Sequence, residues 1–381
     1  MRILYIYTAL TTIGGADRVL TEKMNYLADH CGHEVYLLTD SQCGRQPVFP
    51  LSAAVHHRDL AVDFDQQYHH GFLMRGYWYI CLMRDYRRKL EQQLSEIRPD
   101  VIVSAFGRES SFADLFRRYA RLTVAEVHTT KSNMRAMPLL RKRGFPYTLV
   151  AAYLERSINR AARSFDRVVV LNESERRAWQ TVRPVDVIPN SLTLNPSQTA
   201  SLSNLRVIFV GRAENEKGPD RMLQAWNIVH PSHPDWQLHM FSVGTQLEML
   251  KAYAASHGFG SSVVFRQPTR DLLTEYLASS VCVMTSRFEG FGMVLLEAMA
   301  CGVPCVAYDC PYGPASIIRD GEDGFLVPDG DESALVRALS RLMDDDGLRR
   351  QFGANARRNI QRFSTEAVMA QWQQLFNSPR R

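Results

Sequence analysis

The sequence predicts an α/β protein of two domains, each built around a doubly wound parallel sheet. Short apolar runs alternate with amphipathic segments, which is typical of buried parallel strands separated by helices. The alternation is interrupted after residue 188 by a polar stretch and begins again at residues 205–210. The chain has 381 residues, a comfortable length for two domains of ordinary size.

The apolar runs and amphipathic segments give a provisional element order. In the first half, strands are expected at residues 3–7, 35–39, 101–105, 123–127 and 168–171, and helices at 16–30, 84–97, 111–120 and 148–163. In the second half, strands are expected at 205–210, 238–242, 263–265, 281–284 and 304–307, and helices at 219–229, 245–257, 270–278, 291–301, 332–344 and 347–360. A last amphipathic segment, 364–377, predicts a terminal helix.

These elements divide into an N-terminal domain, residues 1–188, and a C-terminal domain, residues 189–363. The hinge is expected where the polar stretch begins, and the terminal segment 364–381 is expected to pack back on the N-terminal domain. Parallel sheets of this type bind ligands outside the carboxyl ends of their strands, so we expect the site in a cleft between the domains. Closure of that cleft is the expected motion.

Cysteine usage and hydropathy narrow the class of protein. The seven cysteines are odd in number and irregularly spaced, and no C-x2-C pair occurs, so no zinc site is expected and a reducing cytoplasm is the natural compartment. The first ten residues, MRILYIYTAL, form a short run without a cleavage pattern, which favours a buried strand over a signal peptide. No stretch of 18 apolar residues is present, so no membrane-spanning helix is predicted.

Positive charge is concentrated in the first half of the chain. Residues 1–190 carry 27 Lys and Arg against 20 Asp and Glu, whereas residues 191–381 carry 18 against 20. A basic half favours an acidic partner: anionic lipid headgroups, a phosphorylated acceptor or nucleic acid. No recognised nucleic-acid module is present, so nucleic acid is not the expected partner. The basic segment 131–143, with methionines and leucines interleaved, fits a membrane-surface element or a plain solvated loop.

The strongest motif is residues 285–298, which read TSRFEGFGMVLLEA between an expected strand and an expected helix. Two glycines at a helix start allow close approach to the backbone, and the helix N-terminus favours an anion such as a diphosphate. Glu289 and Glu297 are eight residues apart, about 12 Å along a helix axis, which suits two sugars joined by a diphosphate. An ordinary capped helix whose Glu297 faces solvent is the alternative on spacing alone.

Two further loops carry groups suited to a phosphate ligand. Residues 211–218, GRAENEKG, follow the first strand of the second half and place Arg212 and Lys217 where a diphosphate would rest. An exposed charged loop is the alternative. Residues 12–16, TIGGA, follow the first strand of the chain and do not match the dinucleotide fingerprint. That Gly-Gly pair either turns backbone amides toward the cleft or makes a tight turn that requires positive φ.

Together these motifs resemble the retaining family-4 glycosyltransferases of GT-B fold. The E-x7-E motif of that family is matched by Glu289 and Glu297, and the flanking text 287–292 and 296–304 is very similar to it. Residues 320–321, 324–327 and the Gly14-Gly15 pair also match. The segment 309–314, DCPYGP, resembles members that build bacterial surface polysaccharides or lipid-linked glycans. The resemblance covers essentially the whole chain, strongly over 205–330 and weakly over 40–100.

The resemblance implies a role for each matched position. Arg212 and Lys217 should hold the donor diphosphate, Glu297 the ribose and Glu289 the transferred sugar. The histidine at the reacting centre is expected to be His128, which follows an N-domain strand. A packing histidine at a strand end is the alternative. Further contacts with the donor are expected from Gly15, Gly290, Phe291, Gly292, Met293 and Val294, whose backbone amides lie near the phosphates. Arg266 is expected to lie beside the nucleotide base.

The implied chemistry is transfer of a hexose or N-acetylhexosamine with retention of configuration, from a donor that is UDP-linked by preference over GDP or ADP. No metal or other cofactor is expected, since the departing phosphate serves as base for the acceptor hydroxyl. The acceptor is expected to be a glycan or a polyprenyl-linked glycan, with the protein cytoplasmic and peripheral at the inner face of the plasma membrane. A GT-B nucleotide-sugar 2-epimerase and a non-catalytic sugar-nucleotide sensor are the alternatives.

Overall fold

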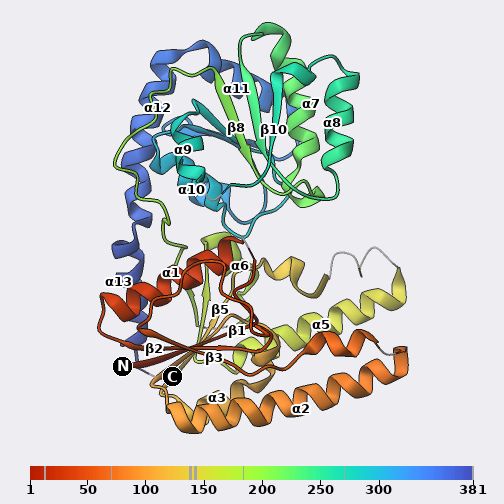
Figure 1. The fold of residues 1–381 in the computed structure, drawn as a ribbon, viewed down its shortest axis with the longest axis vertical. Coiled ribbons are helices and arrows are strands. Elements are labelled where there is room, and N and C mark those ends of the chain that lie inside the picture. Colours follow the sequence, from red (N-terminus) through yellow and green to blue (C-terminus); the bar gives the residue numbers. More distant parts are fainter. Residues whose placement is uncertain are drawn as a thin grey trace. The chain divides into compact units, whose positions relative to one another are not determined.

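The computed structural model describes residues 1–12, 14–69, 71–136, 140, 144–182, 184–269 and 271–379. The chain forms two compact units (Figure 1). Unit 1 consists of Met1–Ile188 together with Met369–Arg381, and unit 2 is Pro189–Val368. The C-terminal residues therefore belong to the same unit as the N-terminus, and each unit is described by itself below.

Unit 1 is built on a seven-stranded sheet in the order β3-β2-β1-β4-β5-β6-β7. All of its described strand pairs are parallel. The strands are β1 (Arg2–Tyr7), β2 (Glu34–Thr39), β3 (Val55–Asp59), β4 (Val101–Ser104), β5 (Leu122–Glu126), β6 (Arg167–Val170) and β7 (Val185–Val187). The chain order reverses between β1 and β4, which is the switch point where doubly wound sheets bind ligands.

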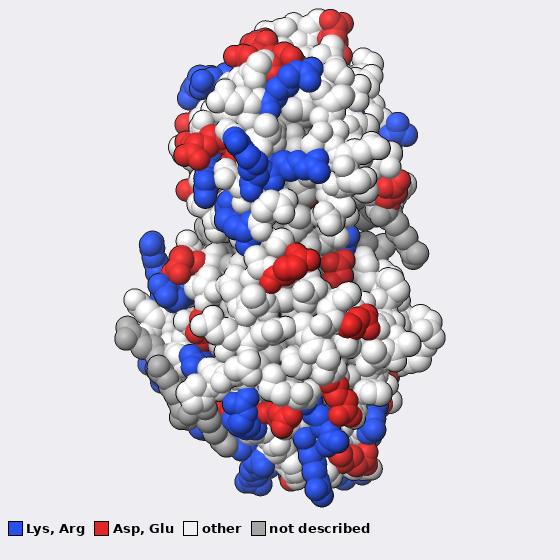
Figure 2. Space-filling model, turned by 90° about the vertical axis from the view of Figure 1, so that its left-hand side faces the viewer, with Lys and Arg blue, Asp and Glu red and all other residues white. Residues whose placement is uncertain are grey.

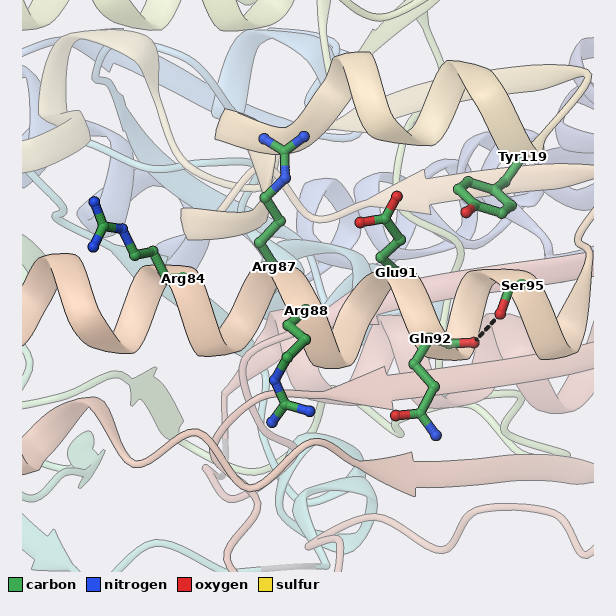
Figure 3. A pocket seen from close by; sticks show the side chains of 7 residues that line it. All are labelled: Arg84, Arg87, Arg88, Glu91, Gln92, Ser95 and Tyr119. Carbon is green, nitrogen blue, oxygen red and sulfur yellow. Dashed lines mark hydrogen bonds between the residues drawn. The ribbon is translucent and has the colours of Figure 1, made fainter.

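The helices of unit 1 are α1 (Gly15–Asp29), α2 (Phe72–Ile97), α3 (Ala113–Tyr119), α5 (Phe145–Arg163), α6 (Glu173–Ala178) and the later residues of α13 (Thr365–Phe376). Short 3₁₀ turns lie at η1 (Phe64–His69), η2 (Arg108–Phe112) and η3 (Lys131–Ala136). Tyr86, Phe116 and Trp179 are fully buried members of the core. Between α2 and α3, an open groove of about 380 Å³ is lined by Arg84, Arg87 and Arg88 with further polar side chains of α2 and with Tyr119 of α3 (Figure 3).

Unit 2 is built on a six-stranded parallel sheet in the order β10-β9-β8-β11-β12-β13. Its strands are β8 (Arg206–Val210), β9 (Gln237–Phe241), β10 (Val263–Arg266), β11 (Val281–Met284), β12 (Cys305–Asp309) and β13 (Gly324–Pro328). Its helices are α7 (Pro219–Val229), α8 (Leu247–Ser256), α9 (Leu272–Leu277), α10 (Met293–Ala300), α11 (Glu332–Asp344) and α12 (Asp346–Asn359). Its 3₁₀ turns are η4 (Asn215–Lys217), η5 (His230–Ser232), η6 (Gly260–Ser262), η7 (Pro314–Ser316) and η8 (Ile360–Phe363). The chain order reverses between β8 and β11.

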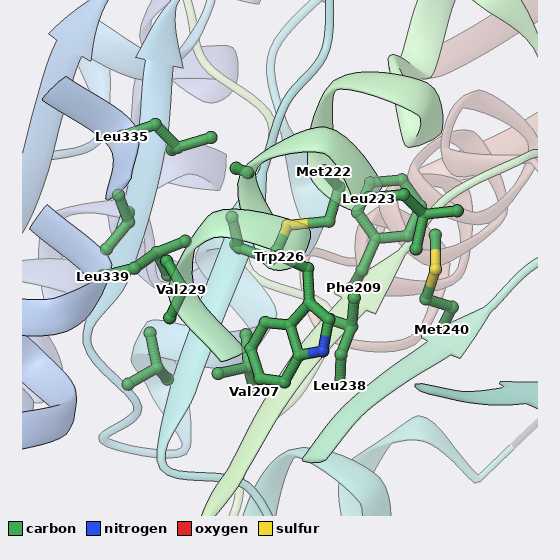
Figure 4. Close-up of a cluster of buried hydrophobic side chains, with 14 of the residues drawn as sticks. Val207, Phe209, Met222, Leu223, Trp226, Val229, Leu238, Met240, Leu335 and Leu339 are labelled. Carbon is green, nitrogen blue, oxygen red and sulfur yellow. The ribbon is translucent and has the colours of Figure 1, made fainter. Parts of the chain in front are cut away.

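The core of unit 2 gathers between its sheet and α7 and α11. Trp226 is fully buried among side chains of β8, β9 and α11 (Figure 4). Its indole Nε1 donates a hydrogen bond to Ser262 Oγ at 3.0 Å, so the large ring is buried without an unmet polar group. This core fixes the end of β8, from which one of the candidate site loops leaves.

Helix α13 joins unit 1 through its second half. Trp372 and Phe376 are buried, and Arg121 donates hydrogen bonds to the carbonyl oxygens of Phe376 at 2.5 Å and Ser378 at 3.0 Å. The first residue of the helix stays with unit 2, where Thr365 Oγ1 donates to Leu192 O at 3.3 Å. The terminal helix expected at 364–377 therefore begins in one unit and ends in the other.

Three strands, the short helix α6 and the start of α2 differ from the sequence-based expectations. Strand β3 has only one buried residue, Val55, so its sequence VHHRD carries no apolar run. No strand is predicted at β7, which ends where the hinge is expected, or at β13, whose residues are singled out only by their likeness to the family. Helix α2 begins at Phe72 rather than at residue 84. The sequence pattern did not mark its first turns as helical, because their apolar residues are exposed and form no core-facing stripe.

Charge on the surface is less segregated than the sequence totals suggest. On the face drawn in Figure 2, Lys and Arg side chains stand beside Asp and Glu side chains on both units. Ion pairs among the described residues, such as Arg58 with Glu96 at 2.9 Å, also place opposite charges together. The basic excess of the first half therefore does not make this face uniformly positive.

Candidate functional site

The two strongest sequence motifs meet at the switch point of unit 2. Residues 211–218 leave the carboxyl end of β8, and residues 285–292 leave the carboxyl end of β11. These two strands are neighbours in the sheet, with Val207 paired to Val281 and Phe209 to Val283. Both loops therefore emerge at the edge where doubly wound sheets place ligands.

Lys217 and Glu289 form the centre of this site. Lys217 Nζ lies 2.8 Å from Glu289 Oε1 and 2.9 Å from Oε2, and Ser286 Oγ donates to Oε1 at 2.6 Å. Glu289 is 8% exposed, whereas the Lys217 side chain is 28% exposed. The carboxylate is thus held from one side by a cation and a hydroxyl, while the ammonium retains access to a ligand.

Close backbone contact locks the two loops together. Gly218 has φ +61°, and a Cβ at this position would lie 2.1 Å from the carbonyl oxygen of Thr285. Thr285 Oγ1 in turn donates to Gly218 O at 2.8 Å. Only glycine allows both this conformation and this approach. The contact fixes Lys217 against the segment that carries Glu289.

Arg287 strengthens the same junction and received no role from the sequence. Its guanidinium donates two hydrogen bonds to Asp220, at 2.9 Å and 2.6 Å, and one to Asn215 O at 2.8 Å. Hydrogen bonding from Arg287 lowers the pKa of the Asp220 carboxyl below its usual value. A bidentate Arg–carboxylate pair has fixed geometry, so Arg287 holds the loop of Lys217 to the loop of Glu289. The sequence signal that could have indicated this pair is an arginine after one strand and an aspartate after the adjacent parallel strand.

Arg212 lies in the same loop but is placed differently. Its side chain is 64% exposed and forms an ion pair with Glu216. To reach Arg212, a ligand anion would have to displace the Glu216 carboxylate or share the guanidinium with it. The structure therefore brings Lys217 and Glu289 into contact, while Arg212 lies on the exposed side of the loop.

Glu297 is buried, which contradicts the alternative that it faces solvent. It is 5% exposed and lies on α10. Tyr276 donates its hydroxyl to Glu297 Oε2 at 3.1 Å, and Thr193 Oγ1 lies 3.4 Å from Oε1. Burial, followed by the charge of Glu297, raises the pKa of Tyr276 well above its usual value. The carboxylate is thus a positioned acceptor of hydrogen bonds inside unit 2.

Helix α10 begins in a way that leaves its N-terminus available. Gly292 precedes it with φ +106°, and no described side chain caps the first turn at Met293 and Val294. Phe291 is 3% exposed and packs edge-on against Phe363 with ring centroids 5.7 Å apart. The alternative of an ordinary capped helix is therefore wrong. The uncapped N–H groups and the helix dipole suit an anion.

The segment 309–314 packs directly beneath this motif. A Cβ on Gly313 would lie 2.6 Å from Phe291 O and 3.1 Å from Glu289 Cβ. Pro311 O accepts a hydrogen bond from the backbone N–H of Glu289 at 3.3 Å. The segment that resembles polysaccharide-building members of the family therefore supports Glu289 and Phe291.

Arg266 ends β10, at the edge of the unit 2 sheet, and is exposed. It lies two strands from β8, on the same carboxyl edge as the two loops. Its charge acts on His239 of the adjoining strand: burial, Arg206 and Arg266 together lower the pKa of His239 to about 4. The structure gives Arg266 no direct contact with Lys217 or Glu289 among the described residues.

In unit 1, Gly15 begins α1 at the end of the loop that follows β1. Gly14 has φ −101°, so the Gly-Gly pair does not need positive φ and that alternative is wrong. Asp17 holds the loop instead, accepting from Tyr7 OH at 2.7 Å and from Thr12 N at 2.8 Å. Residue 13 lies outside the described residues.

His128 follows β5 and stands beside a buried ion pair. Its Nε2 lies 3.0 Å from Glu126 Oε1, and the same oxygen pairs with Lys23. Lys23 and Glu126 are 3% and 1% exposed, and the ammonium of Lys23 lies 4.0 Å from the ring centroid of Trp372. Burial opposes ionisation of Glu126, but the charges of Lys23 and His128 outweigh it and lower the pKa to about 2. Sequence reasoning missed Lys23 and Glu126, because nothing in their spacing links α1 to β5.

The described part of the chain holds neither a candidate metal cluster nor a membrane-spanning helix. No group of three or more His, Cys, Asp or Glu side chains there could hold a metal ion. None of the helices described is both long enough and apolar enough to cross a membrane. Of the basic segment 131–143, residues 137–139 and 141–143 lie outside the described residues.

Comparison with known families covers nearly the whole chain. Residues 13–195 match the family model described as Glycosyltransferase Family 4, and residues 195–359 match the model described as Glycosyl transferases group 1. The chain belongs to the family-4 glycosyltransferases of GT-B fold. The motif-bearing loops of unit 2 fall inside the second of these glycosyltransferase domains, and Gly15 and His128 fall inside the first.

Individual relatives of this glycosyltransferase act in the building of surface polymers. An exopolysaccharide phosphotransferase of Streptomyces coelicolor is 28% identical over 99% of this chain and 40% of its own length. An amylovoran biosynthesis glycosyltransferase of Erwinia amylovora is 31% identical over 45% of this chain and 48% of its own length. The chain thus spans less than half the length of either relative.

Among solved structures, a mutant TarM of Staphylococcus aureus, determined with fondaparinux, alpha-GlcNAc-glycerol and UDP, aligns with a TM-score of 0.77. It covers 99% of this chain and 100% of its own, at 16% identity. At that identity the likeness shows the GT-B fold alone.

Proposed function

We propose that this glycosyltransferase moves a hexose or N-acetylhexosamine from a nucleotide diphosphate sugar to a glycan or lipid-linked acceptor in the assembly of a surface polysaccharide. The observation that carries the proposal is the contact of Lys217 with Glu289 beside the uncapped start of α10. Lys217 and the helix start offer positive charge for a diphosphate, and Glu289 and Glu297 offer acceptors for sugar hydroxyls. UDP is the proposed nucleotide, in keeping with the ligand of the TarM structure.

The proposed mechanism retains the anomeric configuration and uses no metal. Lys217, with Arg212 after it exchanges Glu216, stabilises the charge that develops on the departing diphosphate. Glu289 orients the transferred sugar, and the departing phosphate accepts the proton of the incoming hydroxyl on the same face. Two further roles in the proposal come from the family resemblance alone: His128 acts at the reacting carbon, and Gly15 contacts the phosphates. We propose that the enzyme acts at the cytoplasmic face of a membrane.

A donor screen followed by a mutant assay tests the proposal. Thermal stabilisation by UDP-sugars over GDP- and ADP-sugars identifies the donor, because a ligand that binds only the folded state raises its stability. Glu289→Gln is expected to lower kcat by about 100-fold or more while leaving the fold intact. Glu322→Gln, on an exposed carboxylate of the same unit, is the control and should keep full activity. Transfer is expected to persist in the presence of a metal chelator.

Two assays test the alternative functions, a nucleotide-sugar 2-epimerase and a non-catalytic sensor. Conversion of the nucleotide sugar to an epimer without acceptor would make the protein a 2-epimerase. Donor binding without turnover over a panel of polyprenyl-linked and soluble glycans would make it a sensor. Full activity of Glu289→Gln would contradict the site assignment itself.

A further inference from the structure

Exposed apolar side chains are concentrated on two helices of unit 1. The described part of the chain leaves fifteen large apolar side chains exposed, and ten of them lie in residues 68–80 and 145–153. Tyr77 and Tyr153 are 62% and 71% exposed, and Phe145 is 78% exposed. Scattered single apolar residues need no explanation, but a concentration of this kind marks an interaction surface. Nine of these ten residues fall in the N-terminal halves of α2 and α5, and Tyr68 lies in η1, just before α2.

On α5 the exposed residues follow a helical stripe that changes from apolar to basic. Phe145, Leu149 and Tyr153 are four residues apart, and Arg156 and Arg160 continue the stripe at spacings of three and four. All five are exposed. Residues at these spacings lie on one face of a helix. The outward face of α5 is therefore apolar at its N-terminal end and cationic beyond it.

Helix α2 repeats the same order independently. Tyr77 and Ile80 begin the stripe, and Arg84, Arg87 and Arg88 continue it. Figure 3 shows all three arginines lining the open groove, with Arg84 and Arg87 extending from one side of α2 and Arg88 from the other. Asp85 pairs with Arg88 at 2.7 Å, and Glu91 is the acid that lines the groove. Arg84 and Arg87 leave this stretch of the helix with a positive balance.

The repeated order fits a layered partner. Seven residues separate Tyr77 from Arg84 and also Leu149 from Arg156, about 10 Å along a helix axis. Surface-bound amphipathic helices insert apolar side chains about 5–10 Å into the headgroup and acyl boundary of a bilayer. Tyrosine is favoured at that boundary, and arginine binds phosphate oxygens in a bidentate manner.

We propose that the N-terminal halves of α2 and α5 dock unit 1 on an anionic lipid bilayer. The aromatic and aliphatic residues enter the acyl boundary, and the arginines of both helices contact the lipid phosphates. The protein lies on the bilayer, consistent with the absence of a membrane-spanning helix among the described residues. This inference rests on the membrane location in the proposed function, but lipid binding can be measured without a sugar donor, so the docking surface and the transfer reaction can fail separately.

Vesicle sedimentation with the full chain tests the proposal. Phosphatidylcholine vesicles with and without phosphatidylglycerol are compared at low and high salt. Binding should require phosphatidylglycerol and weaken with salt, because headgroup attraction is screened. The pairs Tyr77→Ser with Ile80→Ser, Leu149→Ser with Tyr153→Ser, and Arg84→Glu with Arg87→Glu should each weaken binding on the order of tenfold.

Matched variants of unit 2 are the controls. Ile228→Ser with Met249→Ser changes two apolar residues that are 50% and 57% exposed on α7 and α8, and Arg337→Glu reverses an exposed charge on α11. These variants should bind vesicles like the original chain. Circular dichroism and thermal melting establish whether each variant folds. If an apolar pair fails to fold, the arginine pair, which alters exposed side chains only, still tests the surface.

Three outcomes would overturn the proposal. The original chain could fail to bind phosphatidylglycerol vesicles. The α2 and α5 variants could bind as well as the unit 2 controls. The same variants could break a dimer detected by light scattering in a chain that does not bind vesicles, which would make the surface an interface between two copies.

Discussion

At the scale of single residues, unit 1 buries carboxyl groups close to the carboxyl edge of its sheet. Asp40 follows β2 and is fully buried; Ser41 donates to its Oδ1 at 2.5 Å, and Oδ2 has no hydrogen-bond partner among the described residues. Burial raises the pKa of Asp40 to about 6. Burial likewise raises the pKa of Glu109, although Ser104 and Gly107 both donate to it at 2.7 Å. Desolvation outweighs hydrogen bonding at both positions.

The raised pKa of Asp40 predicts a pH-dependent loss of stability. The folded state binds this proton more tightly than the unfolded state does, so the contribution is present below the ordinary pKa of 3.8 and is lost as the pH rises through about 6. Asp40→Asn removes the ionisation. Across that window the original chain should lose up to about 3 kcal/mol relative to the variant. Urea unfolding at several pH values measures the difference.

A pH-independent difference between Asp40→Asn and the original chain would contradict this assignment. Asp114→Asn, which neutralises an exposed carboxylate on α3, controls for the change in net charge.

At the scale of elements, two loops and one helix start make the candidate donor site. The loop after β8 and the loop after β11 are joined by Gly218 against Thr285, by the fork of Arg287 on Asp220, and by Lys217 on Glu289. Each contact is local to unit 2. The loops therefore present Lys217 and Glu289 as one preorganised group, which spares a ligand the entropy of ordering them.

Gly218→Ala should disrupt this junction. The substitution meets both the steric cost of φ +61° and a Cβ that would stand 2.1 Å from Thr285 O. We expect a loss of about 3 kcal/mol or more of stability together with weaker donor binding. Chemical unfolding and titration with a nucleotide sugar measure the two effects.

Gly321→Ala separates conformation from contact. Gly321 has φ +74°, but nothing lies within 4 Å of a Cβ built there. It should therefore cost only about 1–2 kcal/mol and leave donor binding unchanged. Equal losses for the two alanine variants would show that the contact of Gly218 with Thr285 contributes nothing.

At the scale of the whole molecule, the chain ends in the unit where it began. The last helix places Trp372 and Phe376 in the interior of unit 1, and Trp372 covers the ammonium of the buried Lys23. Lys23 pairs with Glu126, which also contacts His128. The far end of the sequence therefore supports the residue expected at the reacting centre.

Trp372→Ala should destabilise unit 1 selectively. Removing a fully buried indole costs about 3–5 kcal/mol, and here it also uncovers the ammonium of Lys23. Hydrogen exchange should quicken in β1 and β5 and remain unchanged in β8 and β11. Trp236→Ala, which truncates a ring that is 4% exposed in unit 2, should produce the opposite pattern. Uniform destabilisation of both units by either variant would contradict the division into two cores.

The sequence predicted those parts of the fold that depend on local patterns. Continuous apolar runs such as residues 101–105 and 281–284 predicted buried strands, because a strand covered on both faces must be apolar throughout. The motifs around Lys217 and Glu289 could be placed at strand ends for the same reason. Edge strand β3 was missed because only Val55 on it is buried, so no apolar run marked it.

By itself, the sequence determined that the chain has two α/β domains, each with a parallel sheet, and that its charged motifs follow strands. The tertiary structure alone decided which of those motifs touch. It paired Lys217 with Glu289, buried Glu297 against Tyr276, left Arg212 exposed, and brought Lys23 to Glu126 across more than one hundred residues. The physical reason is that periodicity records which face of an element is buried, whereas the order of strands in a sheet sets which side chains become neighbours.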